Sequence, residues 1–263
     1  MTNYKILFLD IDGTLLRPDD TIEDSSKIAI AEVKKKGIEV FLATGRPLHE
    51  ISHIAEELNI ESFIGYNGAY AIHKGEDIFR APMSSSTVEK YVDIAKNNGH
   101  ELVLYTHEEN IFSDLESPIV KEFISAFHLH KNNSYSLDVI DKILGITLIN
   151  LSENEPALYE KADPSIHLSQ VNVDGLRHSY DVIRDNVNKG IAVQQILELL
   201  SLPREAAIAF GDGMNDKEML KVVGEGFAMG NGHPDLFQYA KYKTTKVTNS
   251  GIYNGLKSLG LVD

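Results

Sequence analysis

The stretch Lys5-Ile6-Leu7-Phe8-Leu9-Asp10-Ile11-Asp12-Gly13-Thr14 decides the fold. Its unbroken apolar run, Ile6 to Leu9, is typical of a strand buried on both faces in a parallel sheet. Asp10 falls at the carboxyl end of this strand, and Asp12 lies two residues beyond it. Ligands of open α/β sheets bind at the carboxyl ends of strands. The stretch therefore predicts a ligand site, although Asp and Gly are also common in solvated turns.

Two later segments repeat this arrangement. Residues 38–43 form an apolar run followed by Thr44-Gly45-Arg46, and residues 206–210 form another followed by Gly211-Asp212-Gly213-Met214-Asn215-Asp216. Helical patterns separate the runs, which predicts a parallel sheet covered by helices. Because such a sheet brings its strand ends to one edge, we expect these polar residues to meet there, joined by Lys189 at the start of a helix.

The middle of the chain has a different rhythm. Between about Pro82 and Asn188 the expected strands and helices lack the strand-then-acid pattern, which predicts a separate α+β unit. The predicted fold is α/β, a Rossmann-like parallel sheet core with an inserted α+β cap domain. The predicted domains are residues 1–81 (core, N-terminal part), 82–188 (cap) and 189–263 (core, C-terminal part).

Composition limits the classes of function. The chain has 263 residues, no cysteine and a formal net charge of −14. An acidic surface argues against nucleic acid or an anionic membrane as the main partner. The lack of cysteine excludes disulfides and cysteine nucleophiles. No signal peptide and no apolar run of about 18 residues is present, so we expect a cytoplasmic protein.

The gathered residues predict phosphoryl chemistry. Clustered carboxylates repel one another and need a cation, and their hard oxygen ligands suit Mg²⁺. A metal with an ammonium group beside it can hold a phosphate dianion. Asp10 is then placed as a nucleophile that forms an aspartyl-phosphate. Asp12 is close enough to protonate the leaving oxygen and later to activate water.

The same motifs resemble the haloacid dehalogenase (HAD) superfamily of phosphatases, and most closely its Cof-type branch with an α+β cap inserted after the third core strand. The resemblance covers nearly the whole chain. It rests on the motifs Asp10-Ile11-Asp12-Gly13-Thr14, Ala43-Thr44-Gly45-Arg46, Tyr66-Asn67-Gly68-Ala69, Lys189-Gly190, Gly211-Asp212-Gly213-Met214-Asn215-Asp216 and Phe227-Ala228-Met229-Gly230-Asn231. One departure is Gly232, where the branch usually has Ala; we expect this position to be remote from the chemistry.

The resemblance implies a role for each position. The implied catalytic residues are Asp10 (nucleophile), Asp12 (general acid/base) and Lys189 (charge neutralisation). The implied phosphate-binding residues are Ile11 through its backbone, Thr44, Gly45, Lys189 and Asn215. The implied Mg²⁺ ligands are Asp10, Asp12, Asp212 and Asp216, the last acting near the second coordination shell. Arg46 and Asn67 are candidate substrate contacts.

The function predicted is that of a Mg²⁺-dependent phosphatase, which acts on small phosphorylated metabolites such as sugar phosphates. A phosphomutase or phosphotransferase that uses the same intermediate is the nearest alternative, and a non-catalytic phosphometabolite-binding module is another. The protein is expected to be a monomer or homodimer. We expect the cap to close through hinges near Pro82 and residues 186–188. Tyr105, His107 and His178 are candidates to contact the leaving group.

A second motif, which matches a known metal-binding pattern, lies in the first third of the chain. His49-Glu50-Ile51-Ser52-His53 matches the zinc-protease pattern His-Glu-x-x-His on a helix expected from Pro47 to Leu58. The apolar positions Ile51, Ile54, Ala55 and Leu58 take the buried face of that helix, and His53 lies nearly opposite. The motif is therefore interpreted as a chance match.

Overall fold

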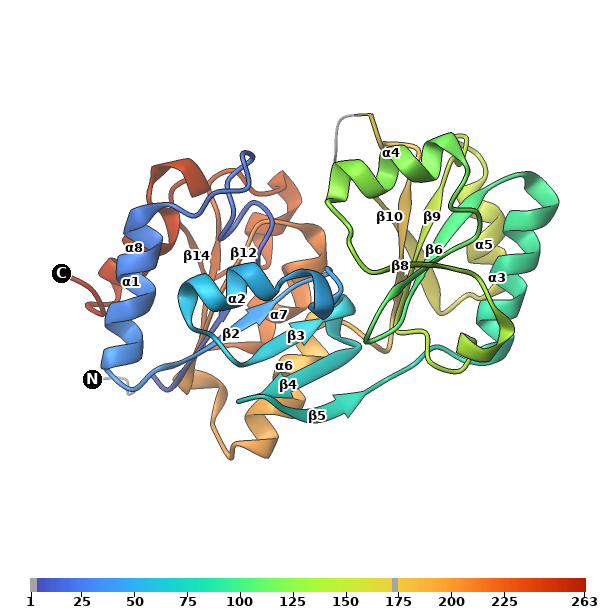
Figure 1. Cartoon of the computed structure of the whole chain (residues 1–263). Coiled ribbons are helices and arrows are strands. Elements are labelled where there is room, and N and C mark those ends of the chain that lie inside the picture. The colour runs from blue at the N-terminus through green and yellow to red at the C-terminus, as the bar shows by residue number, and fades with distance from the viewer. Residues whose placement is uncertain (1–3, 172–174) are drawn as a thin grey trace. The chain divides into compact units, whose positions relative to one another are not determined.

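The computed structural model describes residues 4–171 and 175–263 (Figure 1). The chain divides into two compact units. Unit 1 comprises Met1–Gly45, His53–Ile78 and Asn188–Asp263, and unit 2 comprises Arg46–Ser52 and Phe79–Val187.

Unit 1 is built on an eight-stranded sheet with the order β14-β13-β12-β1-β2-β3-β4-β5. Its strands are β1 (Ile6–Leu9), β2 (Glu39–Ala43), β3 (Phe63–Gly65), β4 (Tyr70–His73), β5 (Glu76–Arg80), β12 (Ala207–Gly211), β13 (Glu225–Ala228) and β14 (Tyr242–Lys243). Neighbours are parallel from β14 to β3, and β4 is antiparallel to β3. The strand β1 lies between β12 and β2, so its apolar run is fully buried.

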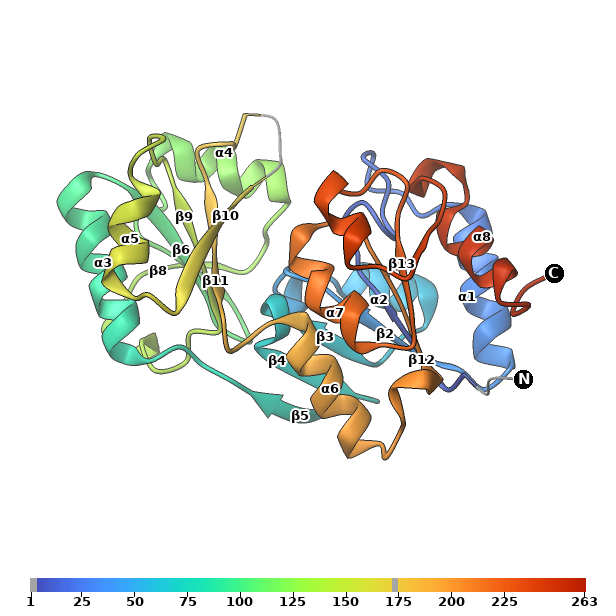
Figure 2. The ribbon, with the colours of Figure 1, turned by 180° about the vertical axis from the view of Figure 1, so that it is seen from behind.

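Helices cover both faces of this sheet. They are α1 (Asp24–Lys35), α2 (Ser52–Leu58), α6 (Lys189–Leu199), α7 (Lys217–Val222) and α8 (Gly251–Ser258). Helix α2 lies in front of the sheet in Figure 1, whereas α6 and α7 lie in front of it in Figure 2, seen from behind. Helix α1 packs against α8, and α6 against α7. Coverage on both faces explains why the central strands are apolar throughout.

Unit 2 has a six-stranded sheet with the order β10-β11-β9-β6-β7-β8. Its strands are β6 (Glu101–Tyr105), β7 (Asn110–Phe112), β8 (Asn132–Ser134), β9 (Gly145–Ile149), β10 (Ile166–Gln170) and β11 (Tyr180–Arg184). The pairs are antiparallel except β7 with β8, which is parallel. This sheet is thus of a different type from the mainly parallel sheet of unit 1.

The helices of unit 2 are α3 (Ser85–Asn98), α4 (Pro118–Phe127) and α5 (Pro156–Ala162). Alternation along β6 divides the core in two, because successive side chains of a strand point to opposite faces. Leu102 and Leu104 join the cluster that contains residues of α3 and α5. Val103 joins the cluster that contains residues of α4. Both faces of the sheet therefore carry an apolar core.

The predicted fold class is confirmed by this arrangement of a Rossmann-like sheet and a second α+β sheet. The predicted domain bounds, a core of residues 1–81 and 189–263 with a cap of residues 82–188, stay a prediction. The helix expected from Pro47 to Leu58 is wrong in its first half, since Leu48–Glu50 form a 3₁₀ turn and α2 begins at Ser52. Among the residues described, none of the helices has the length and apolar content needed to cross a membrane.

Candidate active site

Asp10 and Asp212 are brought together by two adjacent parallel strands. Asp10 follows β1 and Asp212 follows β12, and the register pairs Leu9 with Phe210. The backbone N–H of Asp10 donates to the carbonyl oxygen of Phe210 at 3.1 Å, which extends the ladder past the end of β1. The two carboxyl groups thus start from the same sheet edge, where ligands of parallel sheets bind.

Lys189 is the buried cation of this site. It is the first residue of α6, whose N-terminus is capped by the Asn188 side chain accepting from the N–H of Ile191 at 3.0 Å. The Lys189 side chain is fully buried, and its Nζ lies 2.6 Å from Asp10 Oδ1 and 2.7 Å from Asp216 Oδ1. One ammonium group therefore joins the strand-end Asp10 to the loop after β12.

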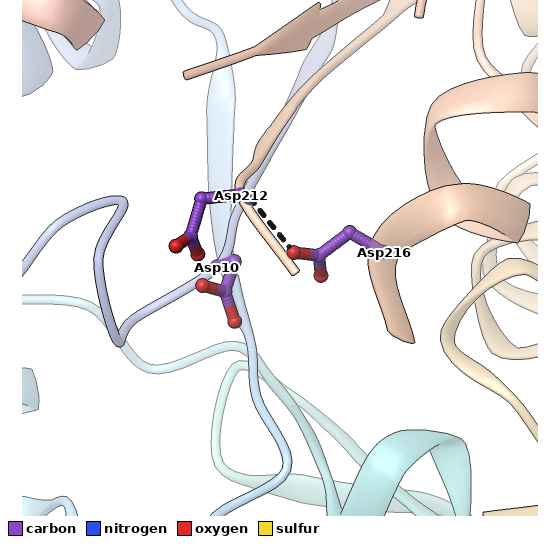
Figure 3. Close-up of side chains that lie close together, drawn as sticks. All are labelled: Asp10, Asp212 and Asp216. Atoms are coloured by element: carbon purple, nitrogen blue, oxygen red, sulfur yellow. Dashed lines mark hydrogen bonds between the residues drawn. The ribbon is translucent and has the colours of Figure 1, made fainter. Parts of the chain in front are cut away.

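Asp216 organises that loop (Figure 3). Its Oδ2 accepts hydrogen bonds from the backbone N–H groups of Asp212 and Gly213, both at 3.0 Å, while Oδ1 accepts from Lys189. Both oxygens are thus engaged by the protein itself. This pattern suits a carboxylate that orients Lys189 and the Asp212 backbone.

The carboxylates perturb one another. Burial, followed by repulsion from Asp216, raises the pKa of Asp10 well above its ordinary value. The same two causes raise the pKa of Asp212 to about 7. Burial would lower the pKa of Lys189, but the charges of Asp10 and Asp216 outweigh it and hold the pKa above its ordinary value. A single ammonium group therefore leaves the cluster with excess negative charge.

These residues fit a divalent cation. One oxygen from each of Asp10, Asp212 and Asp216 lies within 4.8 Å of the others. Figure 3 shows the carboxyl groups of Asp10 and Asp212 next to each other, with Asp216 to one side. Hard carboxylate oxygens are the ligands that Mg²⁺ takes. A divalent cation here would offset the charge that raises the two pKa values.

Asp12 is placed differently from the other acids. Its side chain is exposed and lies outside the cluster of Asp10, Asp212 and Asp216. Its charge still adds to those that raise the pKa of Asp10, after burial and Asp216. An exposed carboxyl group close to the cluster can reach a ligand from the solvent side. The predicted roles of Asp12, and of the buried Ile11 beside it, stay predictions.

Gly13 allows the loop after β1 to pass Asp212. It has a φ of +79°, which side chains rarely adopt, and a Cβ there would overlap the Asp212 carboxyl group. Thr14 Oγ1 donates to Asp212 Oδ1 at 3.3 Å. Asn231 Nδ2 donates to the Gly13 carbonyl oxygen at 2.7 Å, and Asn231 Oδ1 accepts from the N–H of Val247 at 2.7 Å. The Gly230-Asn231 pair is the sequence signal for Asn231, and the sequence alone assigns it no role.

A second group of predicted residues lies together after β2. Thr44 is fully buried, and its carbonyl oxygen accepts from the N–H of Asn67 at 3.1 Å. Asn67 Oδ1 accepts from Asn215 Nδ2 at 2.9 Å. A Cβ at Gly45 would lie 3.1 Å from the Asn67 side chain, so glycine permits this approach. The structure thus links Thr44, Gly45, Asn67 and Asn215, whose phosphate and substrate contacts stay predictions.

Four candidate substrate contacts fall in unit 2: Arg46, Tyr105, His107 and His178. Tyr105 shares a hydrogen bond of 3.1 Å with Thr147 Oγ1, which in turn donates to Asp181 Oδ1 at 2.6 Å. Their roles stay predictions.

The expectation for Gly232 is wrong. A Cβ there would lie 3.0 Å from the Asp212 carbonyl oxygen and 3.2 Å from the Asp212 Cα. The neighbouring His233 N–H donates to the same carbonyl oxygen at 2.8 Å. Gly232 therefore packs directly against the backbone of a candidate metal ligand.

The chain belongs to the haloacid dehalogenase-like hydrolases, because the model of that family matches residues 7–256. This confirms the predicted superfamily, and the predicted enzyme class, a HAD-type phosphatase, is that of its named relatives. The chain is 31% identical to the "Putative phosphatase YkrA" of Bacillus subtilis (strain 168), over 98% of each chain. It is 28% identical to 5-amino-6-(5-phospho-D-ribitylamino)uracil phosphatase YitU of the same strain, over 97% of each. A solved structure of a hypothetical protein from Geobacillus kaustophilus HTA426 has a TM-score of 0.88 and 30% identity, and covers 98% of this chain and all of its own.

Proposed function

We propose that the protein is a Mg²⁺-dependent phosphatase that removes phosphate from small phosphorylated metabolites through an aspartyl-phosphate on Asp10. The observation that carries the proposal is the buried Lys189, whose Nζ lies within 2.7 Å of both Asp10 and Asp216 beside the carboxyl group of Asp212. A related phosphatase named for a phosphoribityl substrate supports the substrate class.

In the first step an Asp10 oxygen attacks phosphorus. The bond between phosphorus and the leaving oxygen breaks, and Asp12 gives that oxygen its proton. Lys189 holds Asp10 Oδ1 at 2.6 Å, which fixes the carboxylate and offsets negative charge that develops nearby. Thr44, the Gly45 amide and Asn215 bind the phosphoryl oxygens.

In the second step water attacks phosphorus and breaks the acyl-phosphate bond. Asp12 takes a proton from this water, so inorganic phosphate leaves and Asp10 returns to its carboxylate form. Asp10, Asp212 and the Asp12 backbone carbonyl would hold Mg²⁺, with Asp216 supporting them. When bound, the cation favours ionised Asp10 and neutralises phosphate charge.

The test is inorganic phosphate release from a panel of sugar phosphates, nucleoside monophosphates and small alkyl phosphates. We expect release from wild type with Mg²⁺ and none with EDTA. Conversion of an ester to its isomer without phosphate release would instead indicate a mutase. Absence of any turnover in Mg²⁺, with the ion still bound, would overturn the proposal.

Metal binding can be followed without turnover. Mg²⁺ at about 100 times its Kd should stabilise the folded wild type by about 2.7 kcal/mol, because it binds only the native state. The measurement is thermal unfolding of wild type and Asp212→Asn with increasing Mg²⁺. The variant should show little shift, and an equal shift in both proteins would remove Asp212 from the metal site.

A further inference from the structure

A short segment after the candidate phosphate-binding loop belongs to the other unit. Residues Arg46–Ser52, called the strap here, group with unit 2, whereas the residues directly before and after them group with unit 1. Three residues of the strap, Pro47, Glu50 and Ile51, are buried. The chain thus passes from Gly45 of unit 1 straight into a segment held by unit 2.

Glu50 is the anchor of the strap in unit 2. Its side chain is 5% exposed. Three donors converge on its Oε1: Asn110 Nδ2 at 2.6 Å, the His130 N–H at 3.0 Å and the Lys131 N–H at 3.4 Å. A carboxylate buried with such partners is held in one position, since leaving it unpaired would be costly.

Asn110 is in turn fixed from several sides. Its Nδ2 also donates to Asn132 Oδ1 at 3.1 Å, and its backbone N–H donates to the Lys131 carbonyl oxygen at 2.7 Å. Its Oδ1 lies 2.9 Å from His49 Nε2, which must carry the proton because an amide oxygen only accepts. The side chain of Asn110 is completely buried. The anchor is therefore a network with defined geometry.

Stability alone does not explain a carboxylate at this position. Burying a charge is expensive, and an apolar side chain would hold the strap at lower cost, as Ile51 does one residue later. Burial lowers the pKa of His49 despite the opposing effects of Asn110 and Glu50, so the ring does not supply a full counter-charge at neutral pH. Directional hydrogen bonds give what apolar packing lacks, a single position for the backbone.

The anchor acts on Arg46 through a short, stiff connection. Only three residues separate Arg46 from Glu50, and one of them is Pro47, whose φ is fixed at −59°. The Glu50 N–H donates to the Pro47 carbonyl oxygen at 3.0 Å, which closes the turn. The position of Glu50 thus restricts where the Arg46 backbone can lie.

We propose that Glu50 is a positioning residue, which fixes the backbone of Arg46 so that the Arg46 guanidinium group recognises the leaving part of the substrate. The inference rests on the proposed function and adds a specificity determinant to it. Thr44 and Gly45 are the proposed phosphate-binding residues, and Arg46 follows them directly in the chain. The expected ligand for the guanidinium group is a leaving group rich in oxygen acceptors, such as a polyol or sugar.

The test compares two substrates, a sugar phosphate and methyl phosphate, whose leaving group offers almost nothing to recognise. Glu50→Ala should raise the KM for the sugar phosphate roughly 10- to 100-fold, as expected for a lost charged hydrogen bond. Its kcat/KM for methyl phosphate should change less than about threefold, because the acids and Lys189 are in unit 1. Glu50→Gln keeps an acceptor oxygen and should restore the KM.

Two controls separate positioning from loss of stability. Tyr91→Phe removes a buried hydrogen bond in unit 2, from the Tyr91 hydroxyl to the Tyr159 carbonyl oxygen at 3.1 Å, and should leave substrate preference unchanged. Arg46→Ala should reproduce the preference of Glu50→Ala, and the double variant should be no worse than Arg46→Ala alone. Additive losses, or equal losses on both substrates, would overturn the proposal.

Hydrogen exchange tests the anchor independently of turnover. The backbone N–H groups of Arg46 and of residues 48–52 should exchange faster in Glu50→Ala than in wild type, Glu50→Gln or Tyr91→Phe. Unchanged exchange would show that Glu50 does not hold the strap. If wild type releases phosphate from no ester, the proposed function fails and the role of Arg46 with it, whereas faster exchange would still establish the anchor.

Discussion

Asp10 in unit 1 and Glu50 in unit 2 are both buried carboxyl groups. Asp10 is surrounded by charge, with Lys189 at 2.6 Å and two further carboxyl groups close by. Glu50 is surrounded by amide donors, of which Asn110 is the nearest at 2.6 Å. The same chemical group thus occurs in two opposite surroundings.

We interpret the surroundings of Asp10 as those of the proposed active site and the surroundings of Glu50 as structural. Burial, followed by repulsion from Asp216, raises the pKa of Asp10 and of Asp212, and perturbed groups of this kind are concentrated at functional sites. Hydrogen bonds around Glu50 satisfy one oxygen and fix the backbone. Burial of a carboxylate therefore carries little information about function until its partners are known.

The largest effect should come from replacing an acid by its amide in unit 1. Asp10→Asn removes the proposed nucleophile and should lower phosphate release by about 10³-fold or more. The same acid-to-amide change at Glu50 leaves the proposed nucleophile in place and should retain turnover. The measurement is phosphate release under saturating Mg²⁺. Equal losses in both variants would contradict the expected difference between Asp10 and Glu50.

Removing the buried ammonium group should have the next largest effect. Lys189→Met leaves Asp10 and Asp216 without their cation, and we expect the unfolding free energy to fall by about 3–5 kcal/mol. Lys27→Met is the matched control, because Lys27 Nζ also lies 2.6 Å from a carboxylate, that of Glu57, but at an exposed site. Its loss should stay below about 1 kcal/mol. Urea unfolding with EDTA measures both, and equal losses would contradict the argument.

A third substitution adds a carboxyl group beside Glu50, so that its surroundings resemble those of Asp10 in unit 1. Asn110→Asp places a second carboxyl group beside Glu50, and we expect a loss of about 2 kcal/mol at pH 7. Repulsion raises the folded pKa of the new pair above its unfolded value, so stability lost at neutral pH returns as the pH falls towards 5. Protonation of His49 beside the new charge acts in the same direction.

The measurement is urea unfolding of wild type and variant at each pH, compared as a difference. Asn133→Asp is the control, since Asn133 also donates to a carboxylate, that of Glu109, but in solvent. It should cost little at any pH. A penalty for Asn110→Asp that grows as the pH falls would contradict the expected sign.

The sequence predicted which residues of unit 1 meet, because each of them can be recognised from its neighbours in the chain. Asp10, Thr44 and Asp212 each follow an apolar run, and a parallel sheet brings such positions to one edge. Lys189 was predicted from its place at the start of a helix, and in the structure its Nζ donates a hydrogen bond to Asp10. The exposed position of Asp12 was not predicted, because residue spacing along a loop does not fix the direction of a side chain.

The unit 2 anchor could not be predicted in the same way. Glu50 and Asn110 are 60 residues apart and occur in no shared pattern. Periodicity treated residues 47–58 as one helix with a single buried face, but a 3₁₀ turn changes that face and buries His49 and Glu50 as well. A polar residue that is buried by its hydrogen bonds leaves no hydrophobic signal in the sequence.

The smallest effect should come from the glycine at which this chain departs from the Cof-type branch. Gly232→Ala puts a methyl group 3.0 Å from the carbonyl oxygens of Asp212 and Met229, so the neighbours must shift slightly. We expect a loss of stability below about 1 kcal/mol and nearly unchanged kcat/KM.

Gly13→Ala is the contrasting variant. Its methyl group would face the Asp212 carboxyl group itself from a φ of +79°, and should lower both stability and phosphate release strongly. Thermal unfolding and phosphate release compare the two. A large loss of activity in Gly232→Ala would mean that displacing the Asp212 backbone harms turnover as much as displacing its carboxyl group. The loop after β13 would then have to be counted as part of the candidate active site.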